Sequence, residues 1–264
     1  MTSHLPDLLE ASFDADHRCH QWLDPNAHFD PPQPFRLRGI KNRLHVHDRY
    51  MDHLRAHGLL SYSKLTSSKE KFLLDPSLMS ALVDRWRPET HTFQSRCGEL
   101  TPTLKDVSMI TALPIIGNPV VPQAYSSNWP LQVEARFGVP FPVNTRSGNR
   151  PRGVPLRWIV THFSNLPANA DNVTLARHLF AYVLYLLGIM FPSSHGDVVL
   201  PSLIKIAEEI VDGPLPPRPI YSFGSAMLAH TYRGLCHATQ KKSKGHILAV
   251  SYDTYLLDVP TYPT

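Results

Sequence analysis

The segment from 75 to 114 constrains the fold most, because the start and stop signals of three short elements follow one another within it. Asp75 can accept a hydrogen bond from the first free N–H groups of a helix, and Pro76 suits the first helical position. A proline disfavours a helical residue before it, so Arg87-Pro88 is expected to end this helix. Apolar residues at intervals of four are expected to share one buried face: Leu78, Leu82 and Trp86.

A small β-hairpin and a second helix are predicted to follow. Residues 90–94 alternate and include β-branched and aromatic side chains, which favours a short strand, with Gly98 in the following turn. Thr103 and Asp106 have the spacing of a capping box, in which side chains and backbone satisfy each other's hydrogen bonds. The helix that they open is expected to stop at Pro114. This order of helix, hairpin and helix needs no catalytic residue to explain it.

A dense set of residues in this segment carries a family resemblance. The set comprises Trp86, Arg87, Pro88, Glu89, Thr90, His91, Phe93, Cys97, Gly98, Glu99, Thr103, Asp106, Leu113 and Pro114. With them the chain resembles the plant mobile domain, also called the aminotransferase-like plant mobile domain, which occurs in transposon-borne genes and in host proteins of the MAINTENANCE OF MERISTEMS-like group. Similar blocks follow at 181–188, 191–192, 221–229 and 232–233, so the resemblance covers roughly 45–250.

The resemblance implies a non-enzymatic nuclear protein that acts through protein partners. Its host relatives support meristem maintenance, genome stability and transposon silencing, together with a phosphatase-like protein of the plant long-form phosphatase seven type. Trp86 would anchor the signature, and exposed loops such as 118–128 would offer the contact surface. The alternative is a transposon-encoded accessory protein that binds DNA.

The helix start and stop signals along the chain predict a mainly α fold: a single multi-helix globular domain with a small β-hairpin near 90–102. We expect an irregular N-terminal segment at 1–40, the plant mobile domain at 41–250 and a divergent C-terminal tail at 251–264, which suggests a truncated or transposon-associated copy. Helices are expected at 44–60, 156–163, 173–190 and 201–211, and after a cap at Ser222. The proline-rich stretch 125–155 is expected to form a long surface connection around an amphipathic segment at 131–137.

Composition supports a folded intracellular chain. The 264 residues are 42% hydrophobic, enough for a sizeable core, and only 18% are charged. The three cysteines form no CxxC pair, which argues against a zinc ribbon or a disulfide framework. The apolar run 179–191 is shorter than the about 20 residues that a membrane helix needs, so a buried helix is expected and no membrane contact.

An aminotransferase would need a lysine that forms a Schiff base with its cofactor, and groups that hold the cofactor's phosphate. None of the lysines here lies in an apolar strand end or a glycine-rich turn. The chain also lacks both nucleotide-binding glycine motifs. We therefore expect no enzymatic activity and no cofactor.

Other reactive-looking clusters have simpler explanations. Residues 194–197, Ser-His-Gly-Asp, suit a turn between helices better than a catalytic triad, and Glu208-Glu209 point apart on a helix. One zinc hypothesis places His53 and His57 one helical turn apart, with His45, His47, Asp48 and Asp52 nearby. Surface or half-buried histidines are the favoured interpretation, so no metal site is expected.

The net charge of +4 permits contact with nucleic acid without requiring it. Three basic segments could hold phosphates if they converge in space. They lie before the first helix, in the proline-rich connection and after the last long helix, and their candidate phosphate contacts are Arg150, Arg152, Lys241, Lys242 and Lys244.

Overall fold

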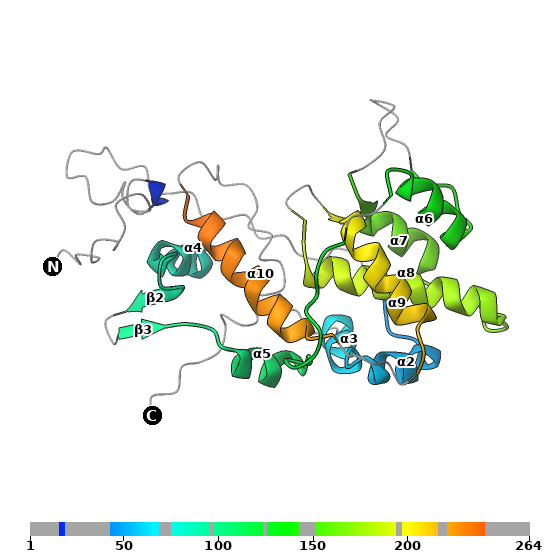
Figure 1. Cartoon of the computed structure of the whole chain (residues 1–264), viewed down its shortest axis with the longest axis horizontal. Helices are drawn as coiled ribbons and strands as arrows, with labels where there is room; N and C mark the ends of the chain where they lie inside the picture. Colours follow the sequence, from blue (N-terminus) through cyan, green and yellow to red (C-terminus); the bar gives the residue numbers. More distant parts are fainter. Residues whose placement is uncertain are drawn as a thin grey trace. The chain divides into compact units, whose positions relative to one another are not determined.

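The computed structural model describes residues 16–18, 43–68, 75–95, 98–123, 126–142, 152–193, 197–215 and 221–240. The chain divides into two compact units (Figure 1). Unit 1 comprises Met1–Gly39, Phe72–Asp106 and Leu228–Thr264, and unit 2 comprises Ile40–Lys71 and Val107–Met227. Within the described ranges helices dominate and the sheets are small, which confirms the prediction of a mainly α fold.

Unit 1 combines helices with a three-stranded antiparallel sheet of order β1-β2-β3. Its elements are α4 (Pro76–Arg85), β1 (Trp86–Arg87), β2 (Thr92–Ser95), β3 (Gly98–Leu100), the first turn of α5 (Leu104–Thr111) and the larger part of α10 (Phe223–Ala238). In the sheet, Phe93 of β2 pairs with Trp86 on one side and with Leu100 on the other. The predicted hairpin therefore carries a third, two-residue strand.

Helix α4 begins as predicted, but its buried face differs from the expected one. The Asp75 side chain accepts a hydrogen bond from the Ser77 N–H at 2.8 Å. Leu78, expected in the core, is 48% exposed, whereas Met79 and Val83 are buried. The expected face assumed that Leu78, Leu82 and Trp86 lie on one helix, but Trp86 belongs to β1. The helix instead packs with the face one position further along.

Unit 2 is built around the long helix α8 (Asn172–Met190). Every side chain from His178 to Met190 is buried, and α7 (Leu156–Phe163) and α9 (Ile204–Asp212) pack beside α8 (Figure 1). The remaining elements are η2 (Asp48–Tyr50), α2 (Met51–Ala56), α3 (Leu60–Ser67), the rest of α5, α6 (Trp129–Phe137), β4 (Val154–Pro155), β5 (Val198–Val199), η3 (Pro201–Leu203) and the start of α10.

Length and composition alone would allow α8 to cross a membrane. Its continuous burial instead identifies it as the core helix of unit 2, since a helix that is apolar all round suits a protein interior equally well. Asp171 caps α8, the helix expected at 173–190, because its carboxylate accepts a hydrogen bond from the Thr174 N–H at 2.8 Å.

The single helix expected at 44–60 is wrong. The structure has η2 and α2 there, followed by a break at Gly58 and then α3. Gly58 has φ +70°, and a Cβ at this position would lie 2.4 Å from Cγ of Pro114. Glycine is therefore required twice over, for the left-handed backbone and for the close approach of the proline ring.

The proline-rich connection contains more structure than expected. The amphipathic stretch belongs to α6, which begins with Pro130 in its first turn and ends at Gly138 with φ +69°. Phe137 is buried, and its ring lies edge-on to Trp158, with a centroid distance of 5.2 Å. The segment at 129–137 therefore contributes to the core of unit 2 as well as to its surface.

Candidate functional site

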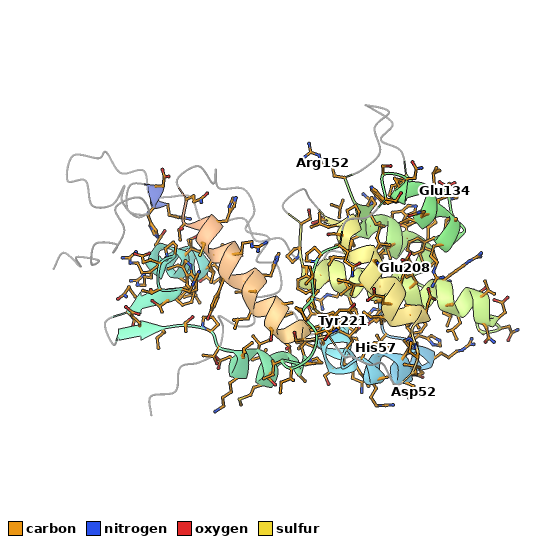
Figure 2. All side chains as sticks on the ribbon, in the orientation of Figure 1. Asp52, His57, Glu134, Arg152, Glu208 and Tyr221 are labelled. Carbon is orange, nitrogen blue, oxygen red and sulfur yellow. The ribbon has the colours of Figure 1, made fainter. Side chains whose placement is uncertain are left out.

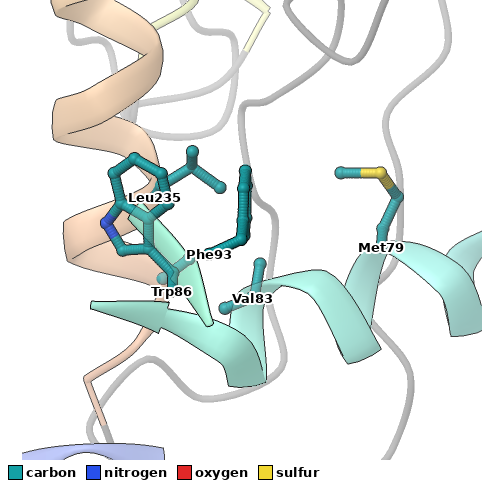
Figure 3. Close-up of a cluster of buried hydrophobic side chains, with 6 residues drawn as sticks. Met79, Val83, Trp86, Phe93 and Leu235 are labelled. Atoms are coloured by element: carbon teal, nitrogen blue, oxygen red, sulfur yellow. The ribbon is translucent and has the colours of Figure 1, made fainter. Parts of the chain in front are cut away.

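The Trp86 cluster forms the hydrophobic core of unit 1 (Figure 3). It contains Met79, Val83, Trp86, Phe93, Leu235 and Ala238, with Leu82, Tyr232 and Cys236 packed against it. Trp86 has no exposed surface, and the Phe93 ring meets it edge-on, with 4.8 Å between the ring centroids. The first residue of the sequence signature therefore joins α4, the sheet and α10.

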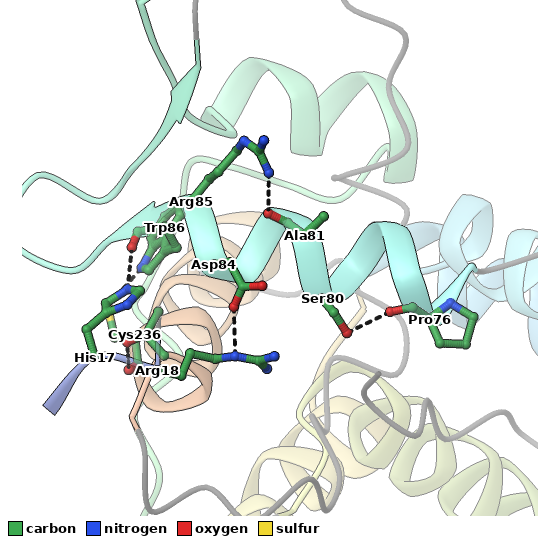
Figure 4. A network of polar contacts seen from close by, with 10 residues as sticks. His17, Arg18, Pro76, Ser80, Ala81, Asp84, Arg85, Trp86 and Cys236 are labelled. Atoms are coloured by element: carbon green, nitrogen blue, oxygen red, sulfur yellow. Dashed lines mark hydrogen bonds and ion pairs between the residues drawn. The ribbon is translucent and has the colours of Figure 1, made fainter. Parts of the chain in front are cut away.

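The polar atoms of Trp86 are also engaged (Figure 4). The indole Nε1–H donates to Sγ of Cys236 at 3.3 Å, and the main-chain carbonyl lies 3.0 Å from Nε2 of His17. Beside this pair, Nε of Arg18 and Oδ1 of Asp84 form a 2.7 Å ion pair. Burial lowers the pKa of His17 and raises the pKa of Asp84. The positive charge of Arg18 opposes the rise at Asp84, because it favours the ionised carboxylate.

His91 occupies a strained position that its surroundings hold in place. Its φ is +54°, in the left-handed region that residues with a side chain rarely adopt. Its ring stacks on Tyr232 with 5.2 Å between centroids and 8° between planes. The Thr101 hydroxyl donates to the His91 carbonyl at 2.6 Å, and the Tyr232 hydroxyl donates to the Pro102 carbonyl at 2.6 Å. The strain is thus offset by contacts from β3's end and from α10.

The exposed face of the hairpin carries a hydrogen-bonded set of side chains. Glu99 accepts from the amide of Gln94 at 2.7 Å and from the hydroxyl of Thr92 at 3.2 Å. The hydroxyls of Thr92 and Thr90 lie 2.7 Å apart. Gly98 has φ +119°, which a residue with a side chain would adopt only under strain. Cross-strand bonds of this kind fix the register of a short hairpin.

Two further signature residues, Arg87 and Pro88, are buried, while Glu89 is half-buried. Cys97, also a signature residue, lies outside the described residues.

The predicted capping box is present at the start of α5. The carboxylate of Asp106 accepts from both the N–H and the hydroxyl of Thr103 at 2.7 Å, and the Thr103 hydroxyl accepts from the Asp106 N–H at 3.3 Å. The helix ends at Thr111, earlier than the expected stop at Pro114, because Ala112 turns into the left-handed region with φ +52°.

In unit 2, the segment with Leu113 and Pro114, which follows α5, contacts the start of α10. The N–H of Gly224 donates to the Pro114 carbonyl at 2.8 Å, and the Ser225 hydroxyl donates to the Ile115 carbonyl at 3.0 Å. A Cβ on Gly224 would lie 2.8 Å from Cγ2 of Ile115. Leu113 itself is buried, so the last two signature residues also have structural contacts.

Residues 115–123, which we name the apolar loop, present hydrophobic side chains on a fixed backbone. Ile116 is 85% exposed and Val121 is 56% exposed. The Asn118 carbonyl accepts from both the N–H and the hydroxyl of Ser222, at 2.8 and 3.1 Å. Further along, the Gln123 N–H donates to the Ser202 carbonyl at 3.2 Å. The apolar loop overlaps the contact surface predicted at 118–128, but sequence patterns alone did not indicate its exposed Ile116.

The histidine pair considered for zinc is used in hydrogen bonds to backbone. Nε2 of His53 lies 2.5 Å from the Ile210 carbonyl, and Nδ1 of His57 lies 2.9 Å from the His53 carbonyl. Burial lowers the pKa of His57. His57 and Asp52 are both labelled in Figure 2. In the described part of the chain, no group of three or more His, Cys, Asp or Glu side chains could hold a metal ion.

Of the two acidic residues Glu208 and Glu209 on α9, Glu209 has a partner from another segment. Glu209 accepts a hydrogen bond from the hydroxyl of Tyr221, which is labelled in Figure 2. Burial, followed by this contact, raises the pKa of Tyr221 to about 12. The pair formed by Tyr221 and Glu209 therefore links the segment before α10 to α9.

The basic residues singled out for phosphate contact fall mostly beyond the described ranges. Arg152 is exposed (Figure 2), whereas Arg150, Lys241, Lys242 and Lys244 lie outside the described residues. Their convergence stays a prediction. The same holds for the turn expected at 194–197, of which only Asp197 is described.

Comparison with known proteins places this framework in a family. The model of the family described as "Plant mobile domain" matches residues 62–256. The chain is 36% identical over 204 residues to a serine/threonine-protein phosphatase 7 long form homolog of Arabidopsis thaliana, covering 75% of this chain and 14% of that protein. It is 36% identical over 168 residues to Protein MAINTENANCE OF MERISTEMS of the same plant, covering 64% of this chain and 34% of that protein.

Protein MAIN-LIKE 2 of Arabidopsis thaliana is 35% identical over 169 residues, which cover 64% of this chain and 24% of that relative. The chain thus spans between 14% and 34% of the length of these three relatives. No solved structure matches it. The family match covers most of both units' described residues, including the whole signature, and the chain therefore belongs to the plant mobile domain family.

Proposed function

We propose that this chain is a protein-interaction module without catalytic activity of its own, acting in the nucleus through protein partners. The likeness to Protein MAINTENANCE OF MERISTEMS supports a role in meristem maintenance, and the family resemblance extends the proposal to genome stability and transposon silencing. The likeness to a phosphatase 7 long form homolog supports a phosphatase-like protein of that type as a partner.

The observation that carries the proposal is the apolar loop. Exposed hydrophobic side chains that lie close together mark interaction sites more often than single ones do. Ile116 and Val121 lie on one short segment, and hydrogen bonds to Ser222 and Ser202 hold its backbone. A loop that is ordered before binding loses less conformational entropy on association than a mobile one. Such a loop is therefore suited to hold a partner.

A structural role for the signature supports the absence of catalysis. Several polar groups of the signature are engaged in folding contacts, such as the indole of Trp86 with Cys236 and the capping box of Thr103 and Asp106. The three lysines that the structure describes, Lys64, Lys105 and Lys205, are exposed. An exposed lysine is not desolvated, and desolvation is one means of lowering a lysine's pKa for Schiff-base chemistry.

The test compares co-purification of nuclear proteins with three forms of the tagged full-length chain, quantified by mass spectrometry. The forms are the wild type, the double variant Ile116→Asp/Val121→Asp, and the control Leu131→Asp. Leu131 is also an exposed apolar residue of unit 2, 52% exposed, but it lies on α6. All three substitutions add a charge at an exposed site, so the folded state should tolerate them equally.

We expect one set of proteins, including a phosphatase-like protein, to be enriched by the wild type and by Leu131→Asp and to be lost from the double variant. Equal recovery by all three forms would refute the apolar loop as the contact surface. Recovery of no enriched nuclear protein by the wild type would refute the proposed function.

A further inference from the structure

Residues 16–18, which we name the strap, dock on unit 1 from a distant part of the sequence. Their main chain forms an antiparallel bridge between His17 and Gln240, and the Arg18 N–H donates to the Thr239 carbonyl at 2.6 Å. His17 is buried, with its ring nitrogen 3.0 Å from the Trp86 carbonyl. The strap thus contacts both the junction of α4 with β1 and the end of α10.

The surface under the strap has the properties of a receptor for a cation. Asp84, on the last turn of α4, has a carboxylate that is only 12% exposed, and Nε of Arg18 lies 2.7 Å from it (Figure 4). A buried carboxylate is costly unless a cation and hydrogen-bond donors accompany it. The next arginine, Arg85, turns away and donates to the Ala81 carbonyl at 3.1 Å. The strap therefore supplies the cation that the Asp84 position requires.

The contacts of the strap define a ligand class. The strap is not an extended strand, because His17 forms an isolated bridge while Asp16 is helical and Arg18 lies in a 3₁₀ turn. Its backbone contact requires only a short peptide segment whose main-chain N–H can reach the Thr239 carbonyl. The ion pair with Asp84 requires an arginine, whose guanidinium suits a carboxylate partner. The strap lies outside residues 62–256, the part that matches the family. The receptor atoms on Asp84, Trp86 and Thr239 lie inside that part.

We propose that Asp84, the Trp86 carbonyl and the Thr239 carbonyl form a binding site for an arginine-containing peptide, which this chain fills with its own residues 16–18. A covalently attached ligand acts at an effective concentration on the order of millimolar. The strap therefore excludes weaker ligands of the same class, and a competing segment gains access only when the strap is released. This makes the strap an intramolecular block on a peptide site.

The experiment measures fluorescence anisotropy of a labelled peptide with the sequence of residues 11–25, carrying Cys19→Ser to prevent oxidation. It is titrated with the full chain as wild type, as Arg18→Ala and as the control Arg55→Ala. Arg55 is an exposed arginine of unit 2, 64% exposed, paired with Asp52. Circular dichroism establishes that each variant is folded. A second peptide carries citrulline in place of Arg18, which keeps the shape and removes the charge without altering the protein.

We expect the peptide to bind Arg18→Ala at least about tenfold more tightly than it binds the wild type or Arg55→Ala, since the ion pair between Arg18 of the strap and Asp84 has been removed. The citrulline peptide should lose at least about tenfold in affinity for Arg18→Ala. Absence of binding to Arg18→Ala, equal affinity for wild type and variant, or equal binding of the arginine and citrulline peptides would each overturn the proposal. Because this site lies in unit 1 and the apolar loop in unit 2, its failure leaves the co-purification result unaffected.

Discussion

Truncation of Trp86 should be the most damaging single change in unit 1. The side chain has no exposed surface and touches α4, the sheet and α10. Replacing a buried tryptophan by alanine costs about 3–5 kcal/mol, because apolar contacts are lost and a cavity remains. Total unfolding free energies of domains are about 5–15 kcal/mol. We therefore expect Trp86→Ala to remove a large fraction of the stability of unit 1.

A graded series separates packing from hydrogen bonding. Trp86→Phe retains a ring but loses the N–H donor to Cys236, and Cys236→Ala leaves that buried donor without its acceptor. Trp86→Phe removes the donor and some buried volume but keeps most of the ring contacts, whereas Cys236→Ala leaves a buried donor unpaired at a cost of about 1–3 kcal/mol. Both variants should therefore lose less stability than Trp86→Ala. Trp129→Ala is the matched control, because Trp129 is only half-buried and belongs to unit 2.

The assay is urea denaturation followed by circular dichroism, combined with hydrogen exchange of peptides resolved by mass spectrometry. Exchange is needed because a chain with two compact units need not unfold in one step. Protection should fall first in peptides from 75–106 and 228–240 for Trp86→Ala, and first in peptides from 126–142 for Trp129→Ala. A loss below about 1 kcal/mol for Trp86→Ala would refute the central role of this residue in the core.

Three further predictions follow from local geometry and charge. In thermal melts, Gly58→Ala should lower the free energy of unfolding by more than about 2 kcal/mol, because Gly58 has a positive φ and lies against Pro114. Gly234→Ala, with open space around it in α10, should leave this free energy unchanged or raise it by up to about 1 kcal/mol. Equal effects of the two substitutions would contradict this explanation. Burial lowers the pKa of His17 and His57 below the ordinary 6.5. As the pH falls, the unfolded chain therefore takes up protons before the folded chain does, and the stability of the fold should decrease below pH 6.5. An unchanged melting temperature between pH 7.5 and 5.5 would refute this pH dependence. If the basic segments converge, duplex DNA binding should weaken steeply with salt and after neutralisation of Lys241, Lys242 and Lys244, and absence of binding at low salt would remove the DNA-binding alternative.

Local signals were predictable where they act within a few residues. The cap at Asp75, the capping box of Thr103 and Asp106, and the cap of α8 at Asp171 each depend on side chains next to the helix that they start. The hairpin was predictable for the same reason, since alternation and a glycine turn are local. Together with the helix signals in the rest of the chain, these elements predicted the mainly α fold that the structure shows.

Features set by distant contacts were not predictable from one sequence. The break at Gly58 depends on Pro114, and the buried face of α4 depends on where Phe93 and Leu235 lie. Periodicity could not choose between the stripe that begins at Leu78 and the one shifted by a single residue.

The candidate surfaces illustrate the same limit. The signature marked important residues but not their partners: nothing in the sequence pairs Trp86 with Cys236, or His91 with Tyr232. The strap was hidden for a further reason, because its two side chains lie in a segment expected to be irregular. Its contacts with Asp84, Trp86 and Thr239 become visible only in the structure.

The central claim, that the apolar loop holds a protein partner, is tested most directly by site-specific photo-crosslinking. A benzophenone amino acid placed at Ile116 or, as control, at Leu131 would be activated in nuclear extract, and crosslinked proteins would be identified by mass spectrometry. Both sites are exposed apolar positions of unit 2, so the photoreactive group reaches solvent at each of them. We expect discrete light-dependent adducts from position 116 that are absent from position 131. No adduct from 116, or the same adducts from both positions, would contradict it.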